Sequence, residues 1–138
     1  MFMIAQPGLV ENISRVANSD PNDVSRRCAS LAIMNLSNGD DNNIPNMTGK
    51  EYLFETLCAL MKDDNPETRR NAAVSLYNLA CSDDNADLLA KYEDGIIIEA
   101  LVEIVTGVGK NTLLWNDKVR SSAAETIFNM TCSKNKAT

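Results

Sequence analysis

The 138-residue sequence lacks histidine altogether, and aromatic residues make up only 5% of it. Without an imidazole, acid–base catalysis would rest on carboxylates or a thiol, and no spacing in the chain singles out such a pair. The cysteines form no CxxC pair and so lack the clustering of a zinc site; they are Cys28, Cys58, Cys81 and Cys132. We therefore expect no enzymatic activity, no bound metal and no cofactor, and we expect the cysteines to be reduced, small, buried side chains.

The chain also has no excess of basic residues and no long apolar run. Its formal net charge is −6 and its pI is about 4.6, so its field repels phosphate backbones and anionic lipids. The most apolar segment, residues 96–105, contains Glu99 and Glu103 and is shorter than the roughly 20 residues that span a bilayer. The first residues show no secretory signal pattern. These absences argue against nucleic acid and membranes as partners and predict a cytoplasmic or nuclear protein.

Three stretches of the sequence repeat one another without gaps. Residues 26–37, 69–80 and 120–131 align, and each has an asparagine at the same position, namely Asn35, Asn78 and Asn129. The asparagines are 43 and 51 residues apart. A repeat of this length is typical of solenoid proteins, in which each unit buries its apolar face against its neighbours.

Each copy has the 3.6-residue period of an amphipathic helix. Small or apolar residues lie six, five and two positions before the asparagine and one position after it; they are Ala29, Ser30, Ile33 and Leu36, then Ala72, Ala73, Leu76 and Leu79, then Ala123, Ala124, Ile127 and Met130. A preceding helix is predicted at residues 9–17, 52–61 and 96–105, and a shorter one at 86–92. Asp, Asn and Pro residues at 19–21, 63–66 and 115–117 are typical of helix N-caps and first turns.

This pattern resembles the armadillo repeat, a three-helix unit of about 42 residues. In that family the second helix follows a glycine with a Leu-x-x-Leu-Val-like run, and the third ends in Ala-Ala-x-x-Leu-x-Asn-Leu-Ala; residues 70–80 match this ending best. The resemblance covers about two and a half to three repeats and implies an all-α, right-handed α-solenoid in one domain, residues 1–138. Its units are a partial repeat at 1–38, a repeat at 39–82 and a repeat at 83–138 with an insertion near 106–114. HEAT-like repeats are the alternative.

The asparagines are the main candidate binding residues. In the armadillo family, the equivalent asparagines line a concave groove and form hydrogen bonds with the main chain of an extended peptide. A side-chain amide is suited to this role because it both donates and accepts hydrogen bonds, as a peptide group does. Alternatively, each asparagine ties down its own helix end or an inter-repeat loop. A helical wheel places further candidates beside the asparagines, at four or seven positions before them; these are Leu31, Val74, Glu125, Asn71 and Ser122.

Two other features have structural interpretations. Arg26, Arg69 and Arg120 align nine residues before each asparagine, about 180° away on the helix, and are expected to pair with loop carboxylates. Residues 107–112 resemble a phosphate-binding loop but follow a predicted helix instead of a strand and have Asn111 where Ser or Thr belongs. We assign neither feature to a ligand.

The sequence therefore predicts a non-catalytic scaffold that binds a protein or peptide segment. The alternative is a substrate- or partner-binding fragment of a larger enzyme-associated protein, such as a ubiquitin ligase. A solenoid needs about three repeats and polar ends, so we also expect marginal stability or self-association through uncapped repeat ends.

Overall fold

The computed structural model describes residues 8–38, 51–106 and 117–132, which form seven α-helices, one 3₁₀ helix and no strand. The elements are α1 (Leu9–Ser19), α2 (Asp23–Leu36), α3 (Glu51–Leu60), α4 (Pro66–Ala80), α5 (Asp83–Lys91), η2 (Tyr92–Gly95), α6 (Ile96–Thr106) and α7 (Asp117–Thr131). Over these ranges the all-helical prediction is confirmed. The insertion predicted near 106–114 and the loop at 107–112 fall almost wholly outside the described residues.

Asparagine caps begin two of the helices that carry the repeated pattern. Asn22 caps α2 and Asn65 caps α4, and each side chain accepts hydrogen bonds from the second and third helical N–H groups. Pro66 follows Asn65 at the first helical position, where its missing N–H is not needed. Such caps stabilise a helix by about 1 kcal/mol each. The polar loops between helices therefore set where α2 and α4 start, as the sequence predicts.

Left-handed backbone precedes two of the other helices. Gly8, before α1, has φ +79°, and Gly95, before α6, has φ +92°. Glu93 and Asp94 in η2 also have positive φ, at 43° and 57°. Side chains with a Cβ rarely adopt these values. The turn that leads into each of these helices requires a positive φ, which explains why a glycine precedes them.

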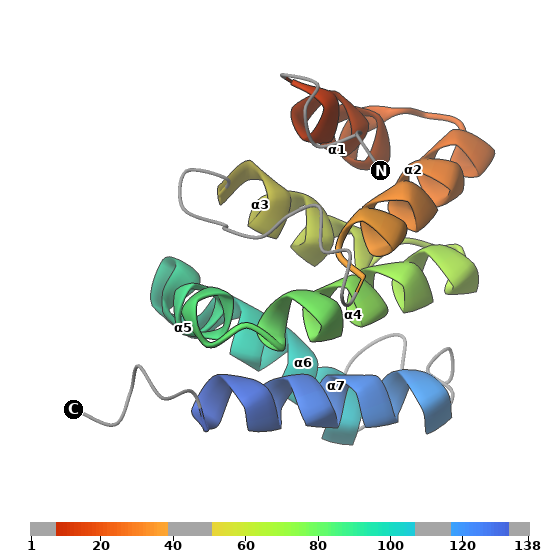
Figure 1. Cartoon of the computed structure of the whole chain (residues 1–138). Coiled ribbons are helices and arrows are strands. Elements are labelled where there is room, and N and C mark those ends of the chain that lie inside the picture. Colours follow the sequence, from red (N-terminus) through yellow and green to blue (C-terminus); the bar gives the residue numbers. More distant parts are fainter. Residues whose placement is uncertain (1–7, 39–50, 107–116, 133–138) are drawn as a thin grey trace.

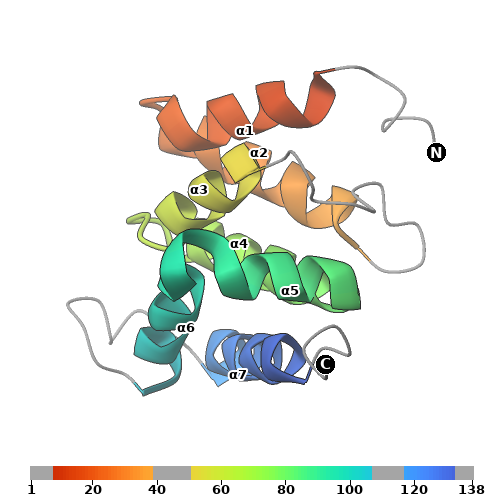
Figure 2. The same cartoon turned by 90° about the vertical axis from the view of Figure 1, so that its left-hand side faces the viewer.

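The helices stack in the order of the repeats. α2 packs on α4 and α4 packs on α7, so the three asparagine-bearing helices form one continuous layer (Figure 1). α1 packs on both α2 and α3, and α6 packs on α7. The α1–α2 pair lies at one end of the stack and the α6–α7 pair at the other (Figure 2). This layered stacking is consistent with the predicted α-solenoid, whose handedness stays a prediction.

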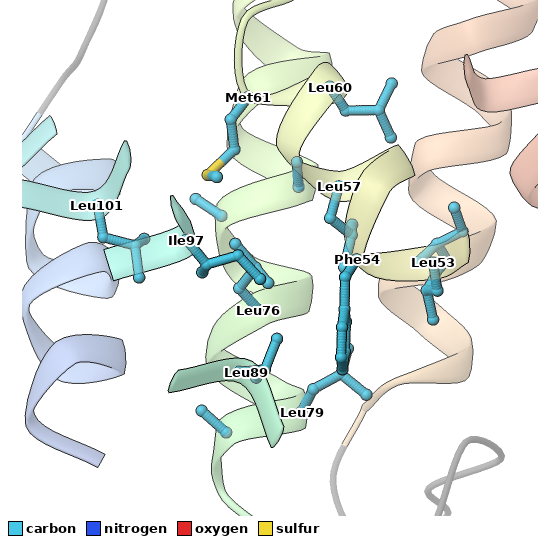
Figure 3. Close-up of a cluster of buried hydrophobic side chains, with 14 of the residues drawn as sticks. Leu53, Phe54, Leu57, Leu60, Met61, Leu76, Leu79, Leu89, Ile97 and Leu101 are labelled. Atoms are coloured by element: carbon cyan, nitrogen blue, oxygen red, sulfur yellow. The ribbon is translucent and has the colours of Figure 1, made fainter. Parts of the chain in front are cut away.

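One apolar core runs between the layers. Figure 3 shows Leu53, Phe54 and Leu57 of α3 gathered with Leu76 and Leu79 of α4, next to side chains from α5 and α6. All five are at most 2% exposed, and burying a side chain of this size contributes about 1.5–3 kcal/mol. The Phe54 ring also meets the ring of Tyr92 edge to face, with centroids 5.2 Å apart. The core is continuous from α1 to α7.

The predicted apolar stripe is buried in all but two of its positions. Every member on α2 and α4 is at most 8% exposed, and so are Ala123 and Met130 on α7. Ala124 is exposed and Ile127 is half-buried. Both are on the last described helix, where no described helix follows to cover them.

The prediction of buried cysteines is wrong for three of the four. All four are free thiols, but Cys28, Cys81 and Cys132 are exposed and Cys58 is half-buried. Cys28 lies on a side of α2 that no other described helix covers, while Cys81 and Cys132 follow the last residues of α4 and α7. Burial raises the pKa of the Cys58 thiol.

Within the described ranges, no helix is long and apolar enough to cross a bilayer.

Candidate functional site

The three repeated asparagines lie near the ends of three helices that pack in series. Asn35 is at the end of α2 and exposed, whereas Asn78 of α4 and Asn129 of α7 are half-buried. Because α2 contacts α4 and α4 contacts α7, the asparagines occupy successive levels of one layer. The stack thus repeats an amide group from one unit to the next.

The Asn78 amide reaches across to the preceding repeat. Its Nδ2 donates to the main-chain oxygen of Met34 at 3.5 Å and to Ser37 Oγ at 3.4 Å. Both distances are long for an N–H···O bond, whose usual length is about 2.9–3.0 Å. Asn78 therefore links the end of α2 to α4, which is close to the predicted tie to an inter-repeat loop.

One turn before the asparagines, the predicted site residues form a mixed surface. Leu31 on α2 is 38% exposed, Val74 on α4 is half-buried, and Glu125 on α7 is exposed. Ser122, a turn earlier on α7, is half-buried. The chemistry along this face thus changes from apolar at α2 and α4 to acidic at α7.

Asn71 does not lie on this face, which corrects its place among the partner-binding candidates. It is 2% exposed, and its Nδ2 donates to Ser30 Oγ of α2 at 3.0 Å. Its Oδ1 is buried with no hydrogen-bond partner. The helical wheel gave the right angle around α4, but α2 covers that side of the helix. Asn71 is a packing residue between repeats.

Two aromatic side chains on α4 and α7 reach the surface although they are not among the predicted site residues. Tyr77 on α4 is half-buried and Phe128 on α7 is 63% exposed. Each stands one position before its asparagine, where α2 has Met34. Cys81 and the Glu125 carboxylate raise the pKa of Tyr77, so its hydroxyl lies close to α7. The recurrence of a large side chain at this position was the available sequence signal.

Two of the aligned arginines, Arg26 and Arg69, bind the loop before α4. Arg26 Nε donates to Asp63 Oδ2 at 2.8 Å, joining α2 to the loop before α4. Burial favours the neutral form of Asp63, but hydrogen bonds from Arg26 and the Asn65 N–H outweigh it and lower the pKa of this carboxyl. Arg69 is 1% exposed and donates to the Asp63 main-chain oxygen. The expected pairing with a loop carboxylate is confirmed for Arg26.

Two surface cavities lie beside α1. One, of about 190 Å³, lies between α1 and α3 and is lined largely by polar side chains, among them Glu11, Ser14, Arg15 and Tyr52. The other, of about 470 Å³, lies on α1 and α2 and is lined mainly by small or apolar side chains, among them Ile13, Val16, Cys28 and Ala32. No three His, Cys, Asp or Glu side chains among the described residues are grouped as a metal site requires.

Part of the chain is similar to a known helical repeat. A HEAT-repeat family model matches residues 53–80, which include most of α3 and all of α4. HEAT repeats generally mediate protein–protein interaction, so the match supports a helical-repeat scaffold and a protein partner. No curated protein and no solved structure matches the chain.

Proposed function

We propose that the chain is a non-catalytic module that binds an extended segment of a partner protein along the face formed by α2, α4 and α7. The observation that carries this proposal is the placement of Asn35, Asn78 and Asn129 at one position in three helices packed side by side. An extended chain presents peptide groups at regular intervals, and a row of amides meets such a ligand whatever its side chains are.

The described contacts of Asn78 are compatible with this role. Its two hydrogen bonds to α2, at 3.4 and 3.5 Å, are weak by geometry, so a peptide group in better alignment would compete with them. Leu31 and Val74 offer apolar contacts beside the amides, and Phe128 adds an exposed ring. These neighbours favour a partner segment with apolar side chains, and the net charge of −6 argues against nucleic acid.

The repeat type that we propose is armadillo. Armadillo units have three helices and HEAT units have two. In the last unit the chain forms α5, α6 and α7 in succession, and α5 packs against both α6 and α7. The helix pair α3–α4, which the HEAT model matches, corresponds to the second and third helices of an armadillo unit.

The proposal is tested with Asn78→Ala and the exposed control Lys62→Ala. A peptide would first be selected on the immobilised chain from a random library, and its affinity then measured by titration calorimetry. Losing two hydrogen bonds to a bound main chain costs about 1–3 kcal/mol, or about 5- to 150-fold in affinity. Because the present bonds of Asn78 are long, the free energy of unfolding should fall by less, about 0.5–1 kcal/mol.

Unchanged peptide affinity in Asn78→Ala would place the binding face elsewhere. A large drop in melting temperature, with full affinity in the folded fraction, would show that the asparagine only joins repeats. Lys62→Ala should match the parent chain in both measurements.

A further inference from the structure

Because the repeats are equivalent, the exposure of a residue on one helix can be compared with that of the residue at the same position on the next helix. Ser30 on α2 is fully buried against α4, and the same position on α4, Ala73, is also fully buried. On α7 this position is Ala124, which is exposed. Likewise Tyr77 is half-buried, whereas Phe128 at the same position of α7 is 63% exposed. The α6–α7 end thus presents the same face that α2 presents to α4, and no described helix packs on it.

The opposite end of the stack presents the complementary face. Asn71 on α4 is buried against α2, and the same position on α2, 43 residues earlier, is Cys28, which is exposed. Cys28 lines the 470 Å³ cavity together with Ile13, Val16 and Ala32. On α4, this face is covered by α2. The same face of α2, at the α1–α2 end, is open and forms part of the apolar cavity. These two ends face away from each other in the stack (Figures 1 and 2).

Charged groups that join the first two repeats recur at the two ends. Within the chain, Arg26 of α2 pairs with Asp63 at 2.8 Å. The positions equivalent to these two are Arg120 on α7 and Asp20 before α2. Asp20 is oriented as Asp63 is, since the Oδ1 atom of each accepts a hydrogen bond from the N–H two residues later. Its Oδ2 is then placed to accept a guanidinium donor, as Asp63 Oδ2 does.

A hydroxyl and an amide recur in the same way. Ser37 Oγ donates to the Met34 main-chain oxygen at 2.8 Å and accepts from Asn78. At the α7 end, Thr131 Oγ1 donates to the Phe128 main-chain oxygen at 3.0 Å, and at the other end Asn35 is exposed at the position of Asn78. The two ends therefore carry the matching halves of the contact that joins the first two repeats.

We propose that copies of this chain stack head to tail, with the α6–α7 end of one copy on the α1–α2 end of the next. The register is that of the first two repeats, which brings Arg120 to Asp20, Thr131 to Asn35, and Ala124 to Cys28 of the next copy. Small side chains meet at the last of these contacts, where Ser30 meets Asn71 inside the chain. A contact between two different faces leaves one face of each kind open on a dimer, so the assembly grows beyond a dimer into a ring or an open filament.

This proposal does not depend on peptide binding at the asparagine layer, and a cysteine crosslink tests it directly. In a variant that keeps Cys28 and has alanine at the other three cysteines, Ala124→Cys places one thiol at each end. Mild oxidation should give a ladder of dimers, trimers and longer species on a non-reducing gel. The matched control is Ala59→Cys, an exposed alanine on α3 away from both ends, and it should give no ladder. Dimers alone, an equal ladder in the control, or no crosslink would overturn the proposal.

Charge reversal provides a second test that leaves the cysteines untouched. Asp20→Arg and Arg120→Glu should each weaken self-association about tenfold by sedimentation analysis. Mixing the two variants should restore it, because one variant keeps Arg120 and the other keeps Asp20, and the reversed pair also attracts. Melting of each variant at low concentration verifies that it is folded. A mixture that associates no better than either variant alone would contradict the register.

Discussion

The buried hydrogen bond between α2 and α4 gives a prediction whose size follows from the contacts. Ser30 is fully buried; its Oγ donates to the Arg27 main-chain oxygen at 2.7 Å and accepts from Asn71 Nδ2 at 3.0 Å. Asn71 Oδ1 already has no hydrogen-bond partner. Ser30→Ala also removes the partner of Nδ2, so both polar atoms of this buried amide are then without a hydrogen bond. Stranding such a group costs about 1–3 kcal/mol. The melting temperature should fall by about 4 °C for each kcal/mol in a chain of this size.

A double variant separates the stranded amide from the lost hydroxyl. Ser30→Ala with Asn71→Ser copies the pair found at the same positions where α4 meets α7, Ala73 and Ser122. Because the amide is gone, the double variant should be more stable than Ser30→Ala alone. Urea unfolding followed by far-UV circular dichroism measures both. A change under about 0.5 kcal/mol for Ser30→Ala, or a double variant less stable than the single one, would refute this reasoning.

Two further predictions concern the loops between helices. The folded pKa of Asp63 lies below its ordinary value of 3.8, so the stability it contributes is present above about pH 4 and is lost as the pH falls towards the folded pKa. Asp63→Asn should flatten this acid limb of the unfolding free energy, whereas Asp64→Asn should not. Gly95 has φ +92° with open space around it, so Gly95→Ala should cost about 1 kcal/mol through backbone strain alone. Gly95→Asn should cost less in the same urea assay, because asparagine tolerates left-handed backbone better.

The helices were predictable because each requires only local information. The repeated apolar stripe, which includes Ile33 and Leu76, identifies the buried side of each helix. Asn65 and Pro66 identify the first residue of α4 without reference to any other helix. The exposure of Ala124 was not predictable in this way. Its residue type matches the buried Ala73, and the difference comes only from whether another helix packs on it.

The candidate site was only partly predictable for a related reason. A helical wheel gives the angle of Asn71 and Asn78 around α4 but does not say on which side α2 lies. Asn71 was therefore placed on the binding face although α2 buries it, and Tyr77 and Phe128, at a different angle, were passed over although they reach the surface. The position of a neighbouring helix is a property of the whole stack.

Differences between the repeats carry the information about a partner, and their common features carry the fold. The stripe residues can vary little because each fills the same space between layers, as Ile33 and Leu76 do. One turn before the asparagines the side chains face outward and are free to differ, and they change from Leu31 and Val74 to Glu125. If the asparagines hold the main chain of a partner, these three positions are the ones that read its side chains. A selected peptide should then have apolar side chains opposite α2 and α4, and a polar or basic one opposite α7, since contact with the Glu125 carboxylate favours a positive charge.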